Sequence, residues 1–260
     1  MEKTEIKYGD IFQIGPHRVA CCDARDQEMI DKLVENNKIK VLLCDVPYGA
    51  SVTQSKRNFG NITTKHKDIL NDQEQTDEEY AKFTKEWLNV IKSHLERKNS
   101  AYLFNCDKMI YALREGFLQA GFKYSQLLIW VKSHAVIGRL NYLPQHELIL
   151  YGWFGVHEFK KSQDKSVLFY PRPSKSKLHP TMKPIPLLRN LILNSSSVGD
   201  IVFDGFLGSG TTILAAEQVK RICYGSELDP EYCQVILDRV TQATGLKAVK
   251  IIDGGSDEKR

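Results

Sequence analysis

The amino-acid sequence predicts an α/β protein with a doubly wound, mostly parallel β-sheet. Short apolar runs alternate with amphipathic segments along most of the 260 residues, which is the pattern of strands joined by helical crossovers. Three of the apolar runs end on a carboxylate, and a glycine-rich turn follows one of them. Neither an internal repeat nor a Pro/Gly-rich linker divides the sequence, so we expect a single domain over residues 1–260.

The expected elements alternate along the chain. Strands are predicted at 39–45, 100–104, 126–131, 146–153, 200–205 and 222–226, and helices at 76–96, 107–121, 185–196, 211–220 and 230–240. The first of these helices begins with a capping box of Thr76 and Glu79, and its apolar residues recur at helical spacing. Gly121 is expected to stop the second helix, and Pro184 and Pro186 to open the third.

The composition is that of an ordinary globular protein, with 42% hydrophobic and 26% charged residues. No apolar run approaches the roughly 18 residues of a membrane span, and the polar start of the chain lacks the apolar stretch of a signal peptide. The six cysteines show neither a C-x-x-C pair nor the spacing of metal ligands. We therefore expect a reducing, cytoplasmic location, no membrane partner and no metal site.

Basic residues are concentrated in two segments. Residues 50–67 contain four Lys/Arg and no acidic residue, and residues 157–183 contain seven Lys/Arg and two acidic residues, whereas the whole chain carries a formal net charge of only +4. This distribution favours a polyanionic partner. A solvated loop surface is the alternative explanation for the same pattern.

The first chemically informative stretch is IKVLLCDVPYG. A buried run ends on Asp45, and Val46, Pro47, Tyr48 and Gly49 follow. The sequence thus places a carboxylate at the end of a strand and an aromatic ring directly beside it, an arrangement that calls for a ligand or a substrate.

The second informative stretch is IVFDGFLGSGTT. An apolar strand ends at Asp204, glycines follow, and a helix begins at the threonines. Glycines in such a turn let a ligand approach the backbone, and the helix start offers free N–H groups. A phosphate-binding P-loop is disfavoured because no lysine precedes the threonines, and a dinucleotide fingerprint would need a glycine where the chain has Ile213.

Glu227 ends the strand that follows this turn and helix. In nucleoside-binding α/β folds, a carboxylate at this position accepts the ribose hydroxyls. A helix N-terminal charge before Pro230 is the structural alternative. The order of strand, glycine turn, helix, strand and acid favours a nucleoside-containing ligand.

Five segments resemble the β-type, permuted amino-group DNA methyltransferases, and together they cover about residues 17–240. DVPYG resembles the D/N/S-P-P-Y motif, DGFLGSGTT the D-P-F-x-G-x-G-T-T motif, and HPTMKPIPLLRNLI the H-P-T-x-K-P segment that precedes it. VACCDARD and LIWVKS…NYLPQHELILYG resemble two further segments of that family. The five occur in the order that is typical of the β-type members.

This resemblance implies a Rossmann-like methyltransferase fold and transfer of a methyl group from S-adenosylmethionine to the N6 amine of a flipped adenine in double-stranded DNA. Aspartate at the first position of the tetrapeptide usually accompanies adenine, whereas serine usually accompanies cytosine N4. Asp45 and the carbonyl of Val46 would accept the two N–H groups of the amine, and Tyr48 would stack on the base. The catalytic residues implied are Asp45, Val46, Pro47 and Tyr48.

The resemblance also implies a cofactor site, in which Asp23 reads the adenine of the cofactor and Glu227 its ribose. The full set is Asp23, Thr181, Lys183, Asp204, Phe206, Gly208, Ser209, Gly210, Thr211, Thr212 and Glu227. DNA phosphates would be held from a basic loop at 50–67 and a short target-recognition insertion at about 152–178, through Lys56, Arg57, Lys160, Lys161, Arg172, Lys175 and Lys177. Gln163 and Arg172 are candidate base readers. A homodimer and a cognate restriction endonuclease are left open as partners.

The chain departs from the family pattern at two positions. Val46 replaces the first proline of the tetrapeptide, and Gly205 replaces the proline after Asp204. Val46 keeps its carbonyl and is held extended by Pro47, so we expect activity to survive, whereas Gly205 is expected to loosen the cofactor turn. The alternatives are a cytosine-N4 methyltransferase and a catalytically silent nucleic-acid-binding subunit. An NAD-dependent oxidoreductase is disfavoured because it has no use for DVPY.

Overall fold

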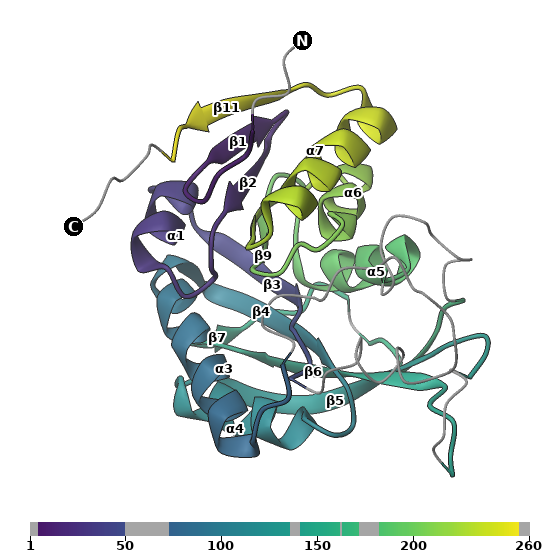
Figure 1. The fold of residues 1–260 in the computed structure, drawn as a ribbon. Helices are drawn as coiled ribbons and strands as arrows, with labels where there is room; N and C mark the ends of the chain where they lie inside the picture. Colours follow the sequence, from purple (N-terminus) through teal and green to yellow (C-terminus); the bar gives the residue numbers. More distant parts are fainter. Residues whose placement is uncertain (1–4, 50–72, 136–140, 162, 172–181, 255–260) are drawn as a thin grey trace, which may run out of the picture.

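One extended sheet runs through the molecule (Figure 1). The computed structural model describes residues 5–49, 73–135, 141–161, 163–171 and 182–254, and the structural statements below concern these residues. The strands lie in the order β11 (Ala248–Ile252), β1 (Ile11–Ile14), β2 (His17–Cys21), β10 (Ile222–Glu227), β9 (Ile201–Asp204), β3 (Ile39–Asp45), β4 (Leu95–Asn105), β6 (His146–Trp153), β5 (Lys123–Val131) and β8 (Val167–Phe169). The short β7 (Val156–His157) pairs with β4 off this path.

The centre of the sheet is parallel. Strands β2, β10, β9, β3 and β4 all run in one direction, so their carboxyl ends meet at one edge. Strand β6 runs antiparallel to β4, and β5 runs antiparallel to β6. The start of β6 therefore lies at the same edge as the carboxyl ends of the parallel strands. We call this the carboxyl edge, and the opposite one the amino edge.

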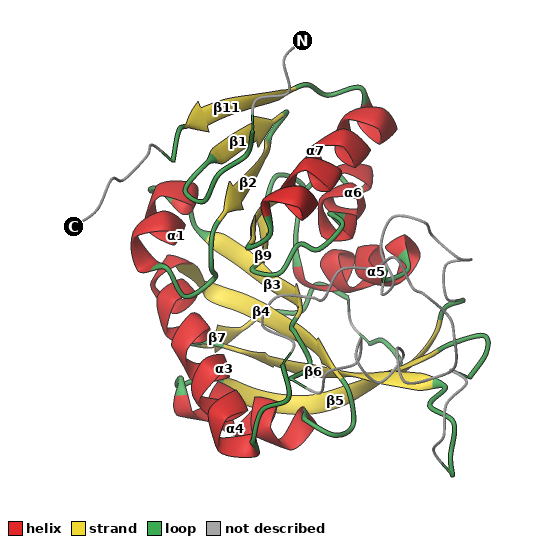
Figure 2. Ribbon diagram, in the orientation of Figure 1, coloured by secondary structure: helices red, strands yellow, loops and turns green. Residues whose placement is uncertain are grey.

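Helices cover both faces of the sheet (Figure 2). Helices α1 (Gln27–Val34), α3 (Asp77–Ile91) and α4 (Ile110–Gln119) lie on one face, and α5 (Ile185–Ser195), α6 (Thr211–Gln218) and α7 (Pro230–Thr244) lie on the other. Their apolar residues belong to two separate buried clusters, one containing Trp87 and Leu113 and the other Leu191 and Ile236. The predicted doubly wound, mostly parallel α/β fold is confirmed.

Local signals in the sequence set the helix ends. The capping box before α3 is formed, because the Thr76 hydroxyl accepts from the Glu79 amide at 3.2 Å and the Glu79 carboxylate accepts from the Thr76 amide at 2.9 Å. A turn of 3₁₀-helix, η1 (Lys92–His94), follows α3. Pro184 caps α5 and Pro186 lies in its first turn, as expected from the fixed φ of proline.

Several elements are longer than the apolar pattern predicts, or escape it. Strand β4 begins at Leu95 rather than at residue 100, because the polar residues 96–99 at its start interrupt the apolar pattern. The short strands β1, β2 and β11 near one side of the sheet are not singled out by the pattern, and neither is α1. Only alternate residues of β11 are partly buried, which leaves too little apolar periodicity to read from sequence.

The structure also bears on the cysteines and on membrane association. All six cysteines are free, and five of them are buried. Among the described helices, none is both long and apolar enough to cross a bilayer. Nor do His, Cys, Asp and Glu side chains of the described residues form a group of three or more that could hold a metal ion.

Candidate active site

Acidic side chains end adjacent strands at the carboxyl edge. Strands β10, β9 and β3 are parallel neighbours, so their last residues, Glu227, Asp204 and Asp45, follow one another along this edge. Asp23 lies just beyond the end of β2, the next strand along. In open parallel sheets ligands bind outside the carboxyl ends of the strands. A row of carboxylates at that place favours a ligand that carries positive charge.

The turn after Asp45 is held by helix α3. The Tyr80 hydroxyl donates to the Pro47 carbonyl at 2.6 Å, and the Asn105 side-chain amide, at the end of β4, donates to the Tyr80 hydroxyl at 2.5 Å. Gly49 has a φ of 60°, and a Cβ built there would lie 2.8 Å from the Tyr80 ring. The position therefore requires glycine.

Val46 lies in the core next to this turn. Its side chain is 1% exposed and belongs to the apolar cluster that also contains Trp87. A branched apolar side chain fits there, so the departure from proline at this position costs the turn no packing.

A buried lysine lies against the Asp45 carboxylate. Lys183, just before α5, places its Nζ 2.5 Å from Asp45 Oδ2 and 3.1 Å from Glu147 Oε2. The Lys183 side chain is only 4% exposed. The same ammonium lies 5.5 Å from the centre of the Tyr48 ring and 5.3 Å from that of Phe104. Lys183, expected as a cofactor ligand, is thus brought to the predicted catalytic residues.

Glu147 comes to this site because of the sheet topology. It lies at the start of β6, which runs antiparallel to β4, so the carboxylate projects at the carboxyl edge. The Tyr48 hydroxyl donates to Glu147 Oε2 at 2.9 Å and lies 3.4 Å from Asp45 Oδ1. Lys132, just after β5, places its Nζ 2.8 Å from Glu147 Oε1. The resulting charge cluster consists of Asp45, Tyr48, Lys132, Glu147 and Lys183.

The two carboxylates of this charge cluster titrate differently. For Asp45, burial and the nearby Glu147 raise the pKa, and Lys183 opposes them. For Glu147, two lysines outweigh burial and lower the pKa to about 2. Although burial disfavours its charge, Lys183 has a raised pKa because it lies between both carboxylates. Burial, followed by the two carboxylates, raises the pKa of the Tyr48 phenol, which therefore stays protonated.

The glycine turn between β9 and α6 is organised by two acids. Asp204 accepts from the Phe206 amide at 3.0 Å and from the Thr212 hydroxyl at 2.6 Å. Glu227 accepts from the Gly208 amide at 2.8 Å and from the Asp229 amide at 3.0 Å. These bonds fix the turn although Gly205 stands where the family has proline, so the expected loosening is counteracted by side-chain acceptors.

Glu227 and Asp204 both have strongly perturbed pKa values. Burial raises the pKa of Asp204 to about 7, and the nearby Asp45 and Glu227 add to the effect. Burial likewise raises the pKa of Glu227 to about 7, against the hydrogen bonds from the Asp229 and Gly208 amides. Two carboxylates that titrate near neutral pH at a strand edge are a frequent mark of a functional site.

Arg239 on α7 also holds the turn. Its guanidinium donates to the Ser209 carbonyl at 2.7 Å, to the Ser209 hydroxyl at 2.9 Å and to the Thr211 hydroxyl at 3.0 Å. Gly210 caps α6 with a φ of 76°, and a Cβ there would lie 3.0 Å from Ile236 of α7. Helix α7 thus fixes the shape of the turn, and the glycine serves this packing.

The remaining predicted cofactor residues differ in position. Asp23 accepts from the Arg25 amide at 2.8 Å and from its guanidinium at 2.8 Å, near the end of β2. The Phe206 ring packs edge-on against Trp87, with 5.4 Å between centroids. Thr181 lies outside the described residues.

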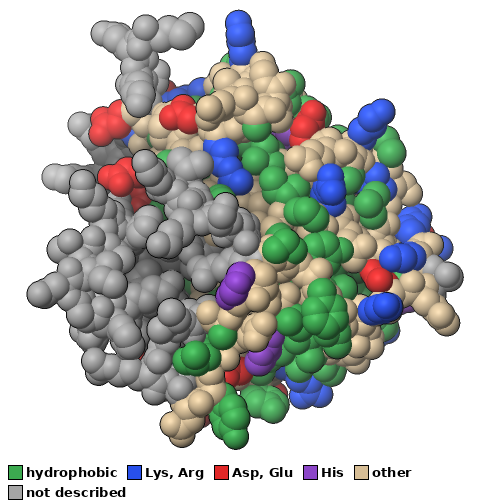
Figure 3. Space-filling model, turned by 90° about the vertical axis from the view of Figure 1, so that its right-hand side faces the viewer, with side chains coloured by type: hydrophobic (Ala, Val, Ile, Leu, Met, Phe, Trp, Pro, Cys, Tyr) green, Lys and Arg blue, Asp and Glu red, His purple; other side chains and the backbone are tan. Residues whose placement is uncertain are grey.

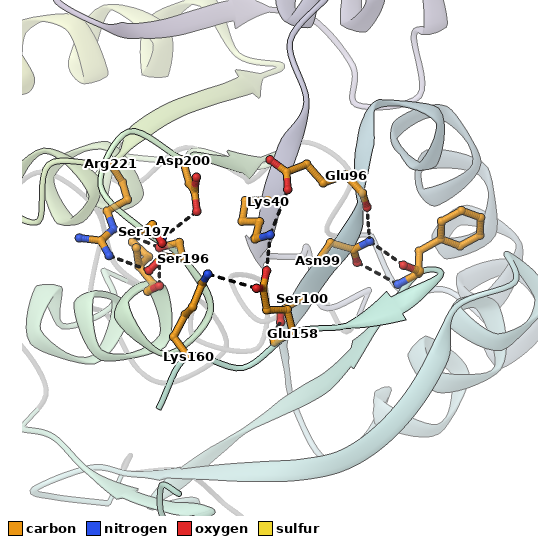
Figure 4. Close-up of polar contacts among 12 residues, drawn as sticks. Lys40, Glu96, Asn99, Ser100, Glu158, Lys160, Ser196, Ser197, Asp200 and Arg221 are labelled. Carbon is orange, nitrogen blue, oxygen red and sulfur yellow. Dashed lines mark hydrogen bonds and ion pairs between the residues drawn. The ribbon is translucent and has the colours of Figure 1, made fainter. Parts of the chain in front are cut away.

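Of the basic residues predicted to hold DNA, only Lys160 and Lys161 lie within the described residues, and Lys160 does not lie at the carboxyl edge. Lys160 lies beside a groove of about 510 Å³ at the amino edge, where its Nζ is 3.1 Å from Glu158 Oε1 (Figure 4). Glu158 also pairs with the buried Lys40 on β3. Five residues of strand, about 16 Å, separate Lys40 from Asp45. Lys160 is therefore remote from the charge cluster.

Lys161 is exposed and pairs with Asp164 at 3.3 Å. Gln163 is exposed in the same segment, which Asp164 ties to Asn194 of α5 at 2.7 Å. The face that includes α5 carries apolar and basic side chains with fewer acidic ones (Figure 3). The other predicted DNA contacts lie outside the described residues: Lys56, Arg57, Arg172, Lys175 and Lys177.

Glu147, Lys132, Arg239 and Tyr80 were not among the residues assigned to the site from sequence. Glu147 and Lys132 lie inside the segment LIWVKS…QHELIL, whose similarity to the family was visible and could have drawn attention to them. Arg239 and Tyr80 lie in ordinary amphipathic helices and carried no sequence signal.

Comparison with known proteins gives a consistent picture. A family model described as DNA methylase (N6_N4_Mtase) matches residues 39–238. The chain is 22% identical to the type II methyltransferase M2.DpnII of Streptococcus pneumoniae over 92% of this chain and 97% of that protein. It is 27% identical to M.HpaI of Haemophilus parainfluenzae over 80% of this chain and 70% of that protein.

Solved structures share the fold. The crystal structure of the M1.HpyAVI–SAM complex superimposes with a TM-score of 0.62 at 22% identity, covering 85% of this chain and 98% of that one. The cytosine-N4-specific PvuII DNA methyltransferase superimposes with a TM-score of 0.65 at 15% identity, covering 84% of each chain.

Proposed function

Because the chain belongs to the DNA methylase family whose model matches residues 39–238, we propose that it transfers a methyl group from S-adenosylmethionine to the N6 amine of adenine in double-stranded DNA. The observation that carries the proposal is the position of Asp45. Its carboxylate ends β3 at the carboxyl edge, beside the Tyr48 ring and next to the glycine turn of β9. M2.DpnII and M.HpaI, both named type II methyltransferases, support the methyltransferase part of the proposal.

The residues at the glycine turn fit S-adenosylmethionine. Glu227, whose carboxylate is held by two backbone amides, can accept ribose hydroxyls, and α6 begins without a side-chain cap at Gly210. The row formed by Asp23, Glu227 and Asp204 suits a cationic ligand. When bound, the cofactor supplies an electrophilic methyl group on a positively charged sulfur. The M1.HpyAVI structure contains SAM, which supports this choice of cofactor.

Asp45 and Tyr48 would act on the target base. The nitrogen lone pair of an exocyclic amine is delocalised into the ring, so the amine is a weak nucleophile. A carboxylate that accepts one N–H favours a more tetrahedral nitrogen, and the Val46 carbonyl is the second acceptor proposed. Methyl transfer would form the N–C bond as the S–C bond breaks, and the sulfur would leave as a neutral thioether. One proton must then leave the nitrogen, and the Asp45 carboxylate can receive it and pass it to water. The Tyr48 ring offers a stacking surface to a base taken out of the duplex.

The DNA contacts remain part of the proposal. Residues 152–171 of the proposed target-recognition insertion contain the end of β6 and strands β7 and β8, so about a third of them pair in sheets. We therefore place base reading in residues 172–178 and in the basic loop 50–67, which adjoin Lys183 and Tyr48 in sequence.

The experiment is methylation of unmodified DNA with labelled S-adenosylmethionine, followed by digestion to nucleosides and mass analysis. N6-methyladenine as the main product supports the proposal. The second candidate function is methylation of cytosine N4, which is the specificity of the PvuII DNA methyltransferase whose fold this chain shares. N4-methylcytosine as the main product would keep the methyltransferase assignment and replace the target. DNA without label would reject both.

A further inference from the structure

Glu147 uses both carboxylate oxygens in bonds to the charge cluster. Oε1 lies 2.8 Å from Lys132 Nζ, whereas Oε2 accepts from the Tyr48 hydroxyl at 2.9 Å and lies 3.1 Å from Lys183 Nζ. The Glu147 side chain is 16% exposed. A largely buried carboxylate with three donors has a defined place, and the side chains it binds become fixed relative to one another.

We propose that Glu147 is a positioning residue for methyl transfer, which fixes the tilt of the Tyr48 ring and shares the Lys183 ammonium with Asp45. The inference rests on the proposed function, because it deepens the role of the same site. Glu147 acts here through Tyr48 and Lys183, and the base-facing groups are Asp45 and Tyr48.

The Tyr48 ring is fixed at both of its ends. At the backbone end, the Tyr80 hydroxyl holds the Pro47 carbonyl at 2.6 Å. At the far end, the phenol donates to Glu147 and accepts from Lys183 at 3.2 Å, and Lys183 is itself paired with Glu147 at 3.1 Å. A ring that stacks on a flipped base must present its face at one angle, and two rotatable bonds otherwise leave that angle free. The bonds from Glu147 and from the Lys183 ammonium that Glu147 holds remove this freedom before the base arrives, which lowers the entropic cost of productive binding.

Lys132 in turn holds Glu147. Its side chain is 7% exposed, and its Nζ lies 5.5 Å from the centre of the Trp130 ring. The Lys132 amide also donates to the Gln145 carbonyl at 2.8 Å, which joins the end of β5 to the start of β6. Lys132 and Glu147 are therefore carried by rigid neighbouring strands, as a positioning device requires.

The pKa of Asp45 provides a readout that a purely structural role of Glu147 would leave unchanged. The described groups that face Asp45 are Lys183 before α5, Glu147 on β6, Tyr48 on its own segment and, more distantly, Asp204 on β9. The negative charge of Glu147 raises the pKa of Asp45. Without the negative charge of Glu147, the Lys183 ammonium has Asp45 as its only carboxylate partner in the charge cluster, which also lowers the pKa of Asp45. The pKa of Asp45 should therefore fall when Glu147 is neutralised.

The test uses Glu147→Gln, Tyr48→Phe and the double variant in the full chain. The matched control is Glu158→Gln, because Glu158 also pairs with a buried lysine and also has a pKa lowered to about 2, but lies at the amino edge. Substrates are unmodified genomic DNA and labelled S-adenosylmethionine. Cofactor affinity by calorimetry and the thermal unfolding midpoint are measured for each variant.

We expect Glu147→Gln to lower kcat by about 10- to 100-fold, as misplacement of a reacting group does, with cofactor affinity unchanged. The acid limb of its kcat–pH profile should shift to lower pH. In the Tyr48→Phe background the same substitution should cost less than it does alone, because one of its two targets is already lost. Glu158→Gln should keep the wild-type rate and profile.

An unchanged kcat in Glu147→Gln would overturn the inference while leaving the proposed function intact. The inference would also be overturned if Glu158→Gln lowered kcat as much as Glu147→Gln does. It would be overturned as well if the losses of kcat in Glu147→Gln and Tyr48→Phe simply multiplied in the double variant while the pH profile stayed unshifted. Either outcome would show that Glu147 serves folding only. If the wild-type protein methylates no DNA, the proposed function fails instead. The part of the inference that concerns charge sharing is then decided by ¹³C-carboxyl NMR, with Asp45 assigned from Asp45→Asn. A lower titration midpoint of Asp45 in Glu147→Gln supports the sharing of Lys183 between the two carboxylates, and an unchanged midpoint overturns it.

Discussion

Lys183 Nζ lies 2.5 Å from Oδ2 of Asp45, so the proposed catalytic carboxylate is paired with a buried ammonium. The ammonium opposes the burial that would otherwise favour the protonated carboxyl group, and an ionised Asp45 is the form that accepts N–H donors. The ion pair thus joins the segment before α5 to the end of β3, and it helps to keep the proposed catalytic carboxylate ionised.

Removal of this ammonium should inactivate the enzyme at neutral pH. In Lys183→Met, Asp45 and Glu147 face each other without the shared cation, so one of them takes up a proton. We expect methyl transfer to fall sharply and the free energy of unfolding to drop by about 3–5 kcal/mol, the usual effect of breaking a buried pair. Urea unfolding and single-turnover methylation check this. Lys183→Arg keeps the charge and should lose less stability, and equal losses in both variants would contradict the electrostatic account.

Cofactor affinity should depend on pH through Glu227. The pKa of its carboxyl group is raised to about 7, and the ionised form is the one that suits ribose hydroxyls and a cationic ligand. Affinity for S-adenosylmethionine should therefore rise as pH increases through about 7, and Glu227→Gln should bind more weakly at pH 8 with a smaller pH dependence, because Asp204 remains to titrate. Calorimetry at several pH values measures this. A pH-independent affinity in the wild-type protein would remove Glu227 from the binding site.

The same raised pKa has an opposite consequence for stability without ligand. A carboxyl group whose pKa is higher in the folded state stabilises the protein at low pH, and this contribution is lost as pH rises from about 4.5 to about 7. For Glu227 the contribution reaches at most about 3 kcal/mol. The unfolding free energy of Glu227→Gln should therefore decline less over this window than that of the wild-type protein. Parallel pH curves would contradict the raised pKa.

Arg239 should matter for the cofactor without touching it. Its guanidinium makes three hydrogen bonds to Ser209 and Thr211, and removal frees the glycine turn. We expect Arg239→Met to weaken S-adenosylmethionine binding by about 1.5–3 kcal/mol. Arg189→Met is the matched control, because Arg189 bonds to Gln218 on the exposed surface. Comparable losses in the two variants would show that the effect is not specific to the turn.

Within the basic segment 157–183, the pair Lys175 and Lys177 should contribute more to DNA binding than the pair Lys160 and Lys161. Lys160 lies at the amino edge and pairs with Glu158, whereas Lys175 and Lys177 adjoin Lys183 in sequence. Neutralising Lys175 and Lys177 should reduce the salt slope of DNA binding by about two. Neutralising Lys160 and Lys161 should change it less. Fluorescence anisotropy at several salt concentrations measures both slopes. A larger effect of the Lys160 and Lys161 pair would support DNA binding by Lys160, as the sequence predicts.

The parts of the site that could be predicted follow from parallel strands. Asp45, Asp204 and Glu227 each end an apolar run, and parallel neighbours bring such ends together without further information. Glu147 could not be placed this way, because its approach to Asp45 depends on the antiparallel direction of β6, which an alternating strand–helix pattern does not reveal. Lys183 could be linked to the family but not to Asp45.

The position of Lys160 shows the same limit. Its segment looks like a free basic loop in sequence, yet β7 pairs with the start of β4 and carries it to the amino edge. The role of Arg239 could not be predicted for another reason. A single arginine in an amphipathic helix carries no specific signal, and its contact with the glycine turn follows only from the packing of α7 over that turn.

The central claim is that Asp45 accepts the amine of an adenine base taken out of DNA. The direct measurement is methyl transfer from labelled S-adenosylmethionine to unmodified DNA by the wild-type protein and by Asp45→Asn, with the products weighed as nucleosides and cofactor affinity measured in parallel. We predict N6-methyladenine from the wild-type protein and no detectable product from Asp45→Asn, with cofactor affinities within a few-fold of each other. Methylation by Asp45→Asn near the wild-type rate would contradict the claim.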